Sequence, residues 1–238
     1  MSRRSRRPGG AEVHAEFFID RGYLRLEGFH PQKRMTAIRR TLLDEFKRLS
    51  GERGMPRALH GLPVFQQIGK LSSLVKYPGL HEALMTRELV DEVTRLAGRA
   101  PTAIQGAQLL LSPPQQGSWT LENLNWHVDV KARPADRLPG IQAFFLIDDV
   151  ATHGGATLAL AGSHRVGQRA TAAASLREAL RTPVDLERKL QALGMTMVEM
   201  AGRAGDVFLM DMRLLHTPSV NATKHMRMMA TSRCLLDG

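Results

Sequence analysis

The sequence predicts an α+β fold with a mainly β core, in which an antiparallel β-sandwich or jelly roll is flanked by N-terminal helices. Two observations predict it. Apolar residues recur at helical spacing in much of the first hundred residues, whereas short apolar or alternating segments dominate after Pro101. The length of 238 residues and the hydrophobic content of 43% suit one domain with a sizeable core.

The first half of the chain carries the helical signals. Residues 17–28 predict a helix end, a turn at Gly22 and a strand in which Leu24 and Leu26 alternate with Arg25. Residues 31–50 and 80–97 predict two amphipathic helices, the second stopped by Gly98. Ordinary core packing explains the apolar stripes of both helices.

The second half is mostly strands. A helical segment at residues 175–194 opens with a capping-box pattern and is broken at Pro183. The strands are expected at residues 104–112, 126–130, 140–150, 156–160, 195–200, 206–210 and 226–236.

Composition narrows the function classes. Net charge is +10, but four arginines lie in the first seven residues, so we expect a disordered basic tail at residues 1–12 and a single domain at 13–238. The other cations lack interleaved aromatics, so no nucleic acid is expected as a partner. No apolar run could span a membrane, no secretory signal follows Met1, and the lone Cys234 excludes an intrachain disulfide. A cytoplasmic protein is therefore expected.

One segment suggests metal chemistry. In a strand, His127 and Asp129 face the same side because side chains alternate. With a second, distant histidine, they would form the two-His, one-carboxylate face that is typical of non-haem iron(II) oxygenases. A His-x-Asp pair alone is a weak signal in a chain with 9 histidines. His216 follows a turn and a strand, and Arg227 comes eleven residues later (227 − 216 = 11).

Four segments in order carry a family resemblance: residues 18–29 (FIDRGYLRLEGF), 126–129 (WHVD), 155–164 (GATLALAGSH), and 205–227 with His216, Asn221 and Arg227. From residue 17 to about residue 236 the chain resembles the phytanoyl-CoA dioxygenase family of 2-oxoglutarate oxygenases. The resemblance implies a double-stranded β-helix, a cupin-like jelly roll.

The resemblance also implies a site. His127, Asp129 and His216 would hold Fe(II) as the catalytic metal ligands, and Arg227 would bind the far carboxylate of the co-substrate 2-oxoglutarate. With O₂, such an enzyme would hydroxylate an aliphatic carbon of a small metabolite, such as an amino acid or natural product, and release succinate and CO₂. A carboxylate at Asp129 favours hydroxylation over halogenation, because related halogenases carry a small residue there.

Other side chains are candidates for binding. Gln108 and Ser112 share a strand that is expected to line the site and to touch 2-oxoglutarate or substrate. The bulky Trp126 and Phe144 are expected to wall the substrate cavity, although such aromatics are often simple core. Arg133 and Arg137 would meet an acidic substrate or serve only as solvated loop cations.

Two alternatives stay open. The chain could be a non-catalytic jelly-roll protein that binds a small molecule and retains a metal site, or an oxygenase directed to nucleic acid. Succinate release separates the first from an enzyme, and strongly salt-dependent binding would reveal the second. The sequence names neither the substrate nor the choice between monomer and homodimer.

Overall fold

The computed structural model of the chain describes residues 10–50, 56–130, 137–168, 170–182 and 184–236. The helices in chain order are α1 (Gly10–Arg21), α2 (Gln32–Ser50), η2 (Arg57–Leu59), α3 (Val64–Leu74), α4 (Leu80–Leu84), α5 (Arg87–Ala97), η3 (Ser163–Gln168), α6 (Ala170–Arg181) and α7 (Leu186–Ala192). The strands are β1 (Tyr23–Leu26), β2 (Ala103–Ile104), β3 (Gln108–Ser112), β4 (Gly140–Leu146), β5 (Thr157–Ala161), β6 (Thr196–Glu199), β7 (Val207–Asp211), β8 (His216–Pro218) and β9 (Arg227–Leu235).

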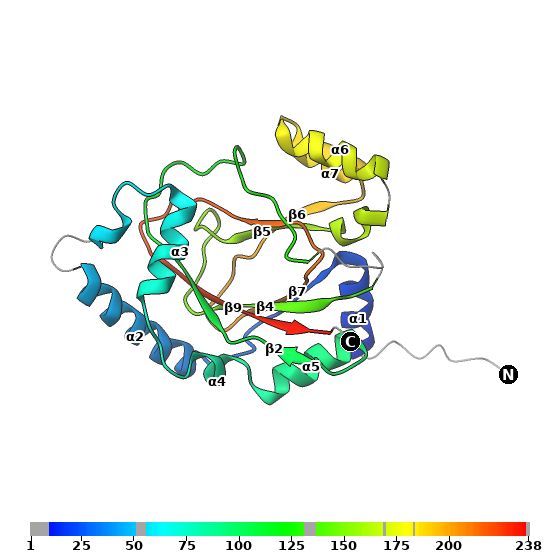
Figure 1. Cartoon of the computed structure of the whole chain (residues 1–238). Helices are drawn as coiled ribbons and strands as arrows, with labels where there is room; N and C mark the ends of the chain where they lie inside the picture. Colours follow the sequence, from blue (N-terminus) through cyan, green and yellow to red (C-terminus); the bar gives the residue numbers. More distant parts are fainter. Residues whose placement is uncertain (1–9, 51–55, 131–136, 169, 183, 237–238) are drawn as a thin grey trace.

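Two antiparallel sheets face each other, as the sequence predicts. The larger runs β1-β7-β4-β9-β2, with β3 also paired to β9, and the smaller runs β6-β5-β8. Figure 1 shows α1, α2, α4 and α5 on the outer side of the larger sheet, and α6 and α7 beyond the smaller one. The space between the sheets is therefore enclosed by strands on both sides.

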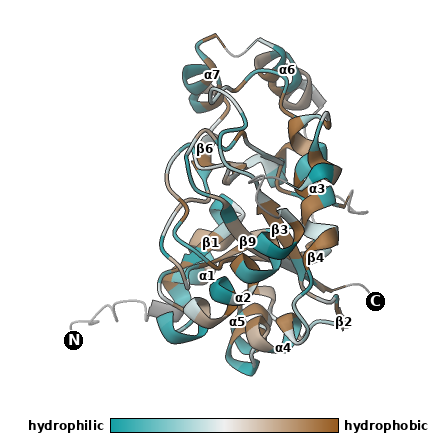
Figure 2. Cartoon of the chain, turned by 90° about the vertical axis from the view of Figure 1, so that its left-hand side faces the viewer, coloured by the Kyte–Doolittle hydropathy of each residue, from teal (hydrophilic) through white to brown (hydrophobic). Residues whose placement is uncertain are grey.

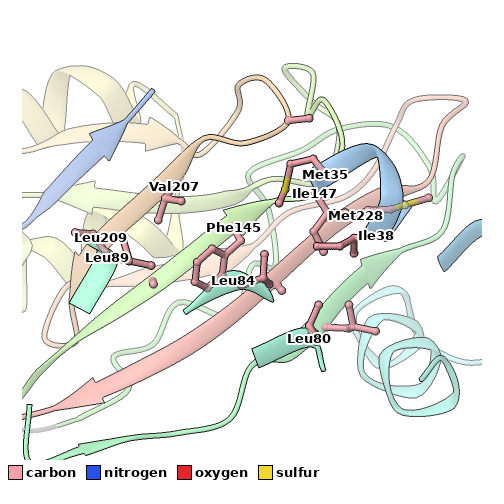
Figure 3. Close-up of a cluster of buried hydrophobic side chains, with 14 of the residues drawn as sticks. Met35, Ile38, Leu80, Leu84, Leu89, Phe145, Ile147, Val207, Leu209 and Met228 are labelled. Atoms are coloured by element: carbon pink, nitrogen blue, oxygen red, sulfur yellow. The ribbon is translucent and has the colours of Figure 1, made fainter. Parts of the chain in front are cut away.

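Strand alternation explains why buried apolar residues lie on both sides of the larger sheet. Ile141, Ala143 and Phe145 of β4 are fully buried on the side that packs against the N-terminal helices. Phe144 and Leu146 point the other way and join the cluster between the two sheets. Figure 3 shows the side that faces the helices, with Phe145 beside apolar side chains of the helices. Burial of each large side chain stabilises the fold by roughly 1.5–3 kcal/mol.

The helices α2 and α5 cover the sheet because their apolar residues recur every three or four positions. Met35, Ile38 and Leu42 of α2 are buried, and the remaining faces of the helix are polar. In Figure 2 apolar colouring concentrates on the central strands, whereas α2 is largely hydrophilic. The helix α5 ends at Gly98, whose φ of 70° suits the left-handed helix stop that the sequence predicts.

The structure departs from the sequence predictions in several places. The helix expected at residues 80–97 is divided into α4 and α5 at Met85 and Thr86, and α6 begins at Ala170 instead of residue 175. The strand expected at residues 104–112 is divided into β2 and β3, and β4 ends at Leu146. Residues 126–130 form no ladder, because His127 alone makes a β-bridge, to His216.

The elements η2, α3, η3 and β8 were not predicted. At the N-terminus, residues 10–12 of the expected tail form the first turn of α1, and residues 1–9 lie outside the described residues. Among the described helices, none has the length and apolarity needed to cross a membrane.

Candidate active site

The three predicted metal ligands converge between the sheets. His127 and His216 bond to each other through their main chains, His127 N to His216 O at 3.0 Å and His216 N to His127 O at 2.9 Å. Asp129 lies two residues beyond His127, and each of the three side chains offers a ligand atom within 4.8 Å of the others. The single bridge thus achieves the convergence that the sequence assigned to a longer strand.

Both histidines are fixed by backbone carbonyls. Nδ1 of His127 lies 2.8 Å from Asn125 O, and Nδ1 of His216 lies 3.1 Å from Leu214 O. A proton on each Nδ1 satisfies these carbonyls and leaves Nε2 as the lone-pair atom that a metal requires. The imidazole centroids are 4.4 Å apart.

Electrostatics favour the unprotonated form of His216. Burial lowers the pKa of His216, and the neighbouring His127 and Arg233 act in the same direction, against Asp129 and the Leu214 carbonyl. A neutral imidazole beside an ionised carboxylate is the state that binds a divalent cation.

The carboxylate of Asp129 is nearly buried, and its two oxygens differ. Oδ1 accepts a hydrogen bond of 2.7 Å from Nη2 of Arg233. Oδ2 is buried without a hydrogen-bond partner and lies 3.6 Å from Nε2 of His216. A buried acceptor without a partner is costly, so Oδ2 is suited to a ligand such as a metal ion.

The turn before His216 is held by the end of the segment at residues 155–164. Ser163 accepts a hydrogen bond of 2.8 Å from Leu215 N through its hydroxyl, and His164 bonds through Nε2 to Ile19 O at 3.0 Å. These contacts give the segment at residues 155–164 a structural role beside the ligands.

A cavity of about 200 Å³ opens beside the three ligands and reaches Arg227. The Arg227 side chain is 4% exposed, its Nη1 lies 3.3 Å from Met229 Sδ, and its Nε has no partner. Burial lowers the pKa of Arg227 to about 10, so the guanidinium is still charged at neutral pH. A buried cation of this kind is suited to a carboxylate ligand.

Two of the other predicted residues line this cavity. Gln108 and Phe144 are among its walls, and the Phe144 ring lies edge-on to His216 at 6.2 Å. Ser112 is opposite Arg227 in the strand register, but its hydroxyl donates to Gln116 Oε1 at 2.7 Å and it does not border the cavity.

The remaining predicted residues lie elsewhere. Trp126 packs with the cluster beneath α6 and α7 and does not border the cavity. Arg137 is half-buried just before β4 and does not border the cavity, and Arg133 lies outside the described residues.

A model of the phytanoyl-CoA dioxygenase family matches residues 18–229, which is most of the chain. The chain belongs to the phytanoyl-CoA dioxygenase family. It is accordingly a non-haem iron oxygenase that depends on 2-oxoglutarate, and the cluster of His127, Asp129 and His216 is its metal-binding triad.

Solved structures agree with the family's fold. The chain is 22% identical to SnoK, described as a non-heme alpha ketoglutarate dependent carbocyclase from nogalamycin biosynthesis, with a TM-score of 0.60 over 95% of this chain and 86% of SnoK. AviO1 from Streptomyces viridochromogenes is 17% identical, with a TM-score of 0.63 over 95% of both chains. EctD from S. alaskensis, solved with 2-oxoglutarate and 5-hydroxyectoine, is 17% identical, with a TM-score of 0.62 over 94% of this chain and 76% of EctD. These matches confirm the jelly-roll fold expected from the sequence. The search of curated proteins found no match.

The site of this family member also contains polar residues that sequence reasoning missed. Gln142, Thr157, Thr231 and Arg233 all border the cavity. Thr231 and Arg233 stand four and six residues after Arg227 on β9, so strand alternation puts all three on one face. The same alternation links Gln142 to Phe144 on β4. An even spacing from an already suspected residue was the signal that could have found them.

Proposed function

We propose that this phytanoyl-CoA dioxygenase family member hydroxylates an aliphatic carbon of a small metabolite, and consumes O₂ and 2-oxoglutarate with release of succinate and CO₂. One observation carries the proposal. The His127, Asp129 and His216 ligands and the buried, carboxylate-free guanidinium of Arg227 border the same cavity within the described part of the chain. A metal ligand set and a buried cation that border one cavity suit a keto acid that carries a second carboxylate.

The residues have distinct roles in this proposal. His127, Asp129 and His216 hold the ferrous ion, which when bound supplies the activation of O₂ that no amino-acid side chain provides. Arg227 binds the far carboxylate of 2-oxoglutarate and fixes the direction in which the co-substrate lies. Phe144 lies edge-on to the His216 ring and adds an apolar wall to the cavity beside it.

The metabolite is proposed to approach between α3 and β3. A second cavity of about 460 Å³ lies there, and Gln108 and Leu110 border both cavities. Phe65 and Ile68 of α3 add apolar surface to the cavity with the ligands. A substrate with an apolar body and few polar groups fits these walls.

The metal and co-substrate sites can be tested together in the absence of O₂. Fe(II) and 2-oxoglutarate added to the wild type should produce the visible metal-to-ligand charge-transfer band. His127→Ala should lack the band, and His60→Ala, which removes an exposed histidine outside the cluster, should keep it. Wild-type protein that binds no metal and shows no band would contradict the proposal.

Hydroxylation needs a separate test, because solved relatives are described as a carbocyclase and as an epimerase. Candidate metabolites should be screened for 2-oxoglutarate-dependent O₂ uptake, and the product of any positive should be analysed by mass spectrometry. One added oxygen atom, labelled when ¹⁸O₂ is supplied, supports hydroxylation. A product formed with succinate but without added oxygen would overturn hydroxylation and leave the oxygenase class intact.

A further inference from the structure

Arg233 forms an ion pair with the carboxylate of Asp129. Its Nη2 lies 2.7 Å from Asp129 Oδ1 and joins the end of β9 to a segment 104 residues earlier. The Asp129 side chain is 8% exposed and that of Arg233 is 35% exposed. The pair therefore lies at the edge of the cavity, with its carboxylate on the buried side.

The contact with Arg233 gives the two carboxylate oxygens of Asp129 different surroundings. Oδ1 is occupied by the guanidinium, whereas Oδ2 has no hydrogen-bond partner and lies on the side of His216. We propose that Arg233 is a positioning residue, which holds Asp129 so that Oδ2 alone is presented to the metal. The inference rests on the metal site of the proposed function and concerns how that site is organised.

The chemistry of arginine suits this role. A carboxylate can rotate about its bond to Cβ, and a planar guanidinium that stays charged restrains this rotation better than a flexible ammonium. The position on β9 is also specific. Arg227 and Arg233 stand six residues apart on one face, so one strand fixes the cation for the co-substrate and the cation for the metal's carboxylate.

The direction in which metal affinity changes when Arg233 is replaced shows whether Arg233 positions Asp129 or is only a nearby charge. If Arg233 were only a nearby positive charge, its removal would reduce repulsion of a divalent cation, and metal affinity would rise. If it positions Asp129, its removal should lower metal affinity, because loss of a partner that orients a ligand typically costs about 10–100-fold. The two readings predict opposite changes.

The experiment measures Mn²⁺ binding by titration calorimetry without 2-oxoglutarate or O₂, in wild type, Arg233→Gln and Arg233→Lys. Arg165→Gln is the matched control, because it removes the same charge from an ion pair with Asp20 outside the cavity. We expect affinity to fall about 10–100-fold in Arg233→Gln, to fall less in Arg233→Lys, and to be unchanged in the control. At saturating Co²⁺, the visible bands should differ from wild type in Arg233→Gln only.

The outcomes are distinct. Equal or tighter Mn²⁺ binding by Arg233→Gln would overturn the positioning role and leave the proposed function standing. If Arg233→Gln does not fold, Arg233→Lys decides, and wild-type affinity in that variant would overturn the role. Wild-type protein that binds no Mn²⁺ would overturn the proposed metal site, and this inference with it.

Discussion

Arg227 is held in the fold at a cost that its ligand should offset. The side chain is 4% exposed, and no carboxylate of the described residues lies within ion-pair distance of it. Burial lowers its pKa to about 10, well below the ordinary value of an arginine, which corresponds to a penalty of about 3 kcal/mol on the charged form. The group is charged in both the folded and the unfolded chain at pH 7, so this penalty falls on the folded state.

Arg227→Met should therefore stabilise the ligand-free protein by about 1–3 kcal/mol, because a side chain of similar length fills the site without the charge. The same variant should lose its response to 2-oxoglutarate. In the presence of Mn²⁺, wild type should gain about 2.7 kcal/mol at a co-substrate concentration of 100 times its Kd, whereas the variant should gain nothing.

Urea unfolding, followed by circular dichroism with Mn²⁺ and with or without 2-oxoglutarate, measures both effects. Arg165→Met, at an exposed ion pair with Asp20, is the control and should change neither quantity by more than about 0.5 kcal/mol. A ligand-free Arg227→Met protein that is less stable than wild type would refute the reasoning about the buried charge. A variant still stabilised by 2-oxoglutarate would refute the role of Arg227 in binding.

Three further variants test the rest of the fold. Burial, with Arg34 nearby, lowers the pKa of His30 to about 4, so stability from this residue is present above pH 6.5 and is lost as pH falls toward 4. His30→Gln should thus abolish a loss of about 2 kcal/mol between pH 7 and pH 5 in urea unfolding, and an unchanged pH slope would contradict this. Asp206 accepts hydrogen bonds from Arg25 and from the Gly28 and Arg203 main chains, so Asp206→Asn should cost about 2–3 kcal/mol in thermal unfolding. Leu84→Ala should cost about 2–5 kcal/mol because its side chain is fully buried, and Mn²⁺ affinity should stay unchanged, since it lies on the helix side of the sheet.

The metal ligands were predictable because several motifs occur in a recognisable order and together carry the family resemblance. His127 and Asp129 are two residues apart, and the turn, strand and histidine ending at His216 form a recognisable order. The contact that brings the three ligands together was not predictable. The sequence suggested a strand at residues 126–130, but one bridge between His127 and His216 sets the geometry, and it joins segments 89 residues apart (216 − 127 = 89).

The alternation of side chains along an extended segment also predicts where Trp126 and Arg233 point. If His127 and Asp129 face the cavity, Trp126 must face away, and it does so by packing against the cluster beneath α6 and α7. The same rule, counted forward from Arg227, leads to Arg233. What the sequence could not supply is the contact between Arg233 and Asp129, because it depends on how β9 lies against a distant segment.

The helix α3 shows where propensity misleads. No helix was predicted at residues 64–74, and Gly69, Ser72 and Ser73 make this sequence a weak helix former. Packing against β3 stabilises it, with Ile68 and Leu71 buried on the inner face. Because α3 supplies Phe65 and Ile68 to the cavity, the substrate side of the site was the part least accessible to sequence reasoning.

The pairing of β9 on both of its edges has a consequence for biosynthesis. It bonds β4 on one side and both β2 and β3 on the other. Among the described strands, β1 bonds only to β7, which is made about 180 residues later (207 − 26 = 181). While the chain is emerging from the ribosome, these early strands must wait with exposed edges, which are open to wrong association. A product that stops before Arg227 should therefore aggregate instead of forming a smaller folded unit.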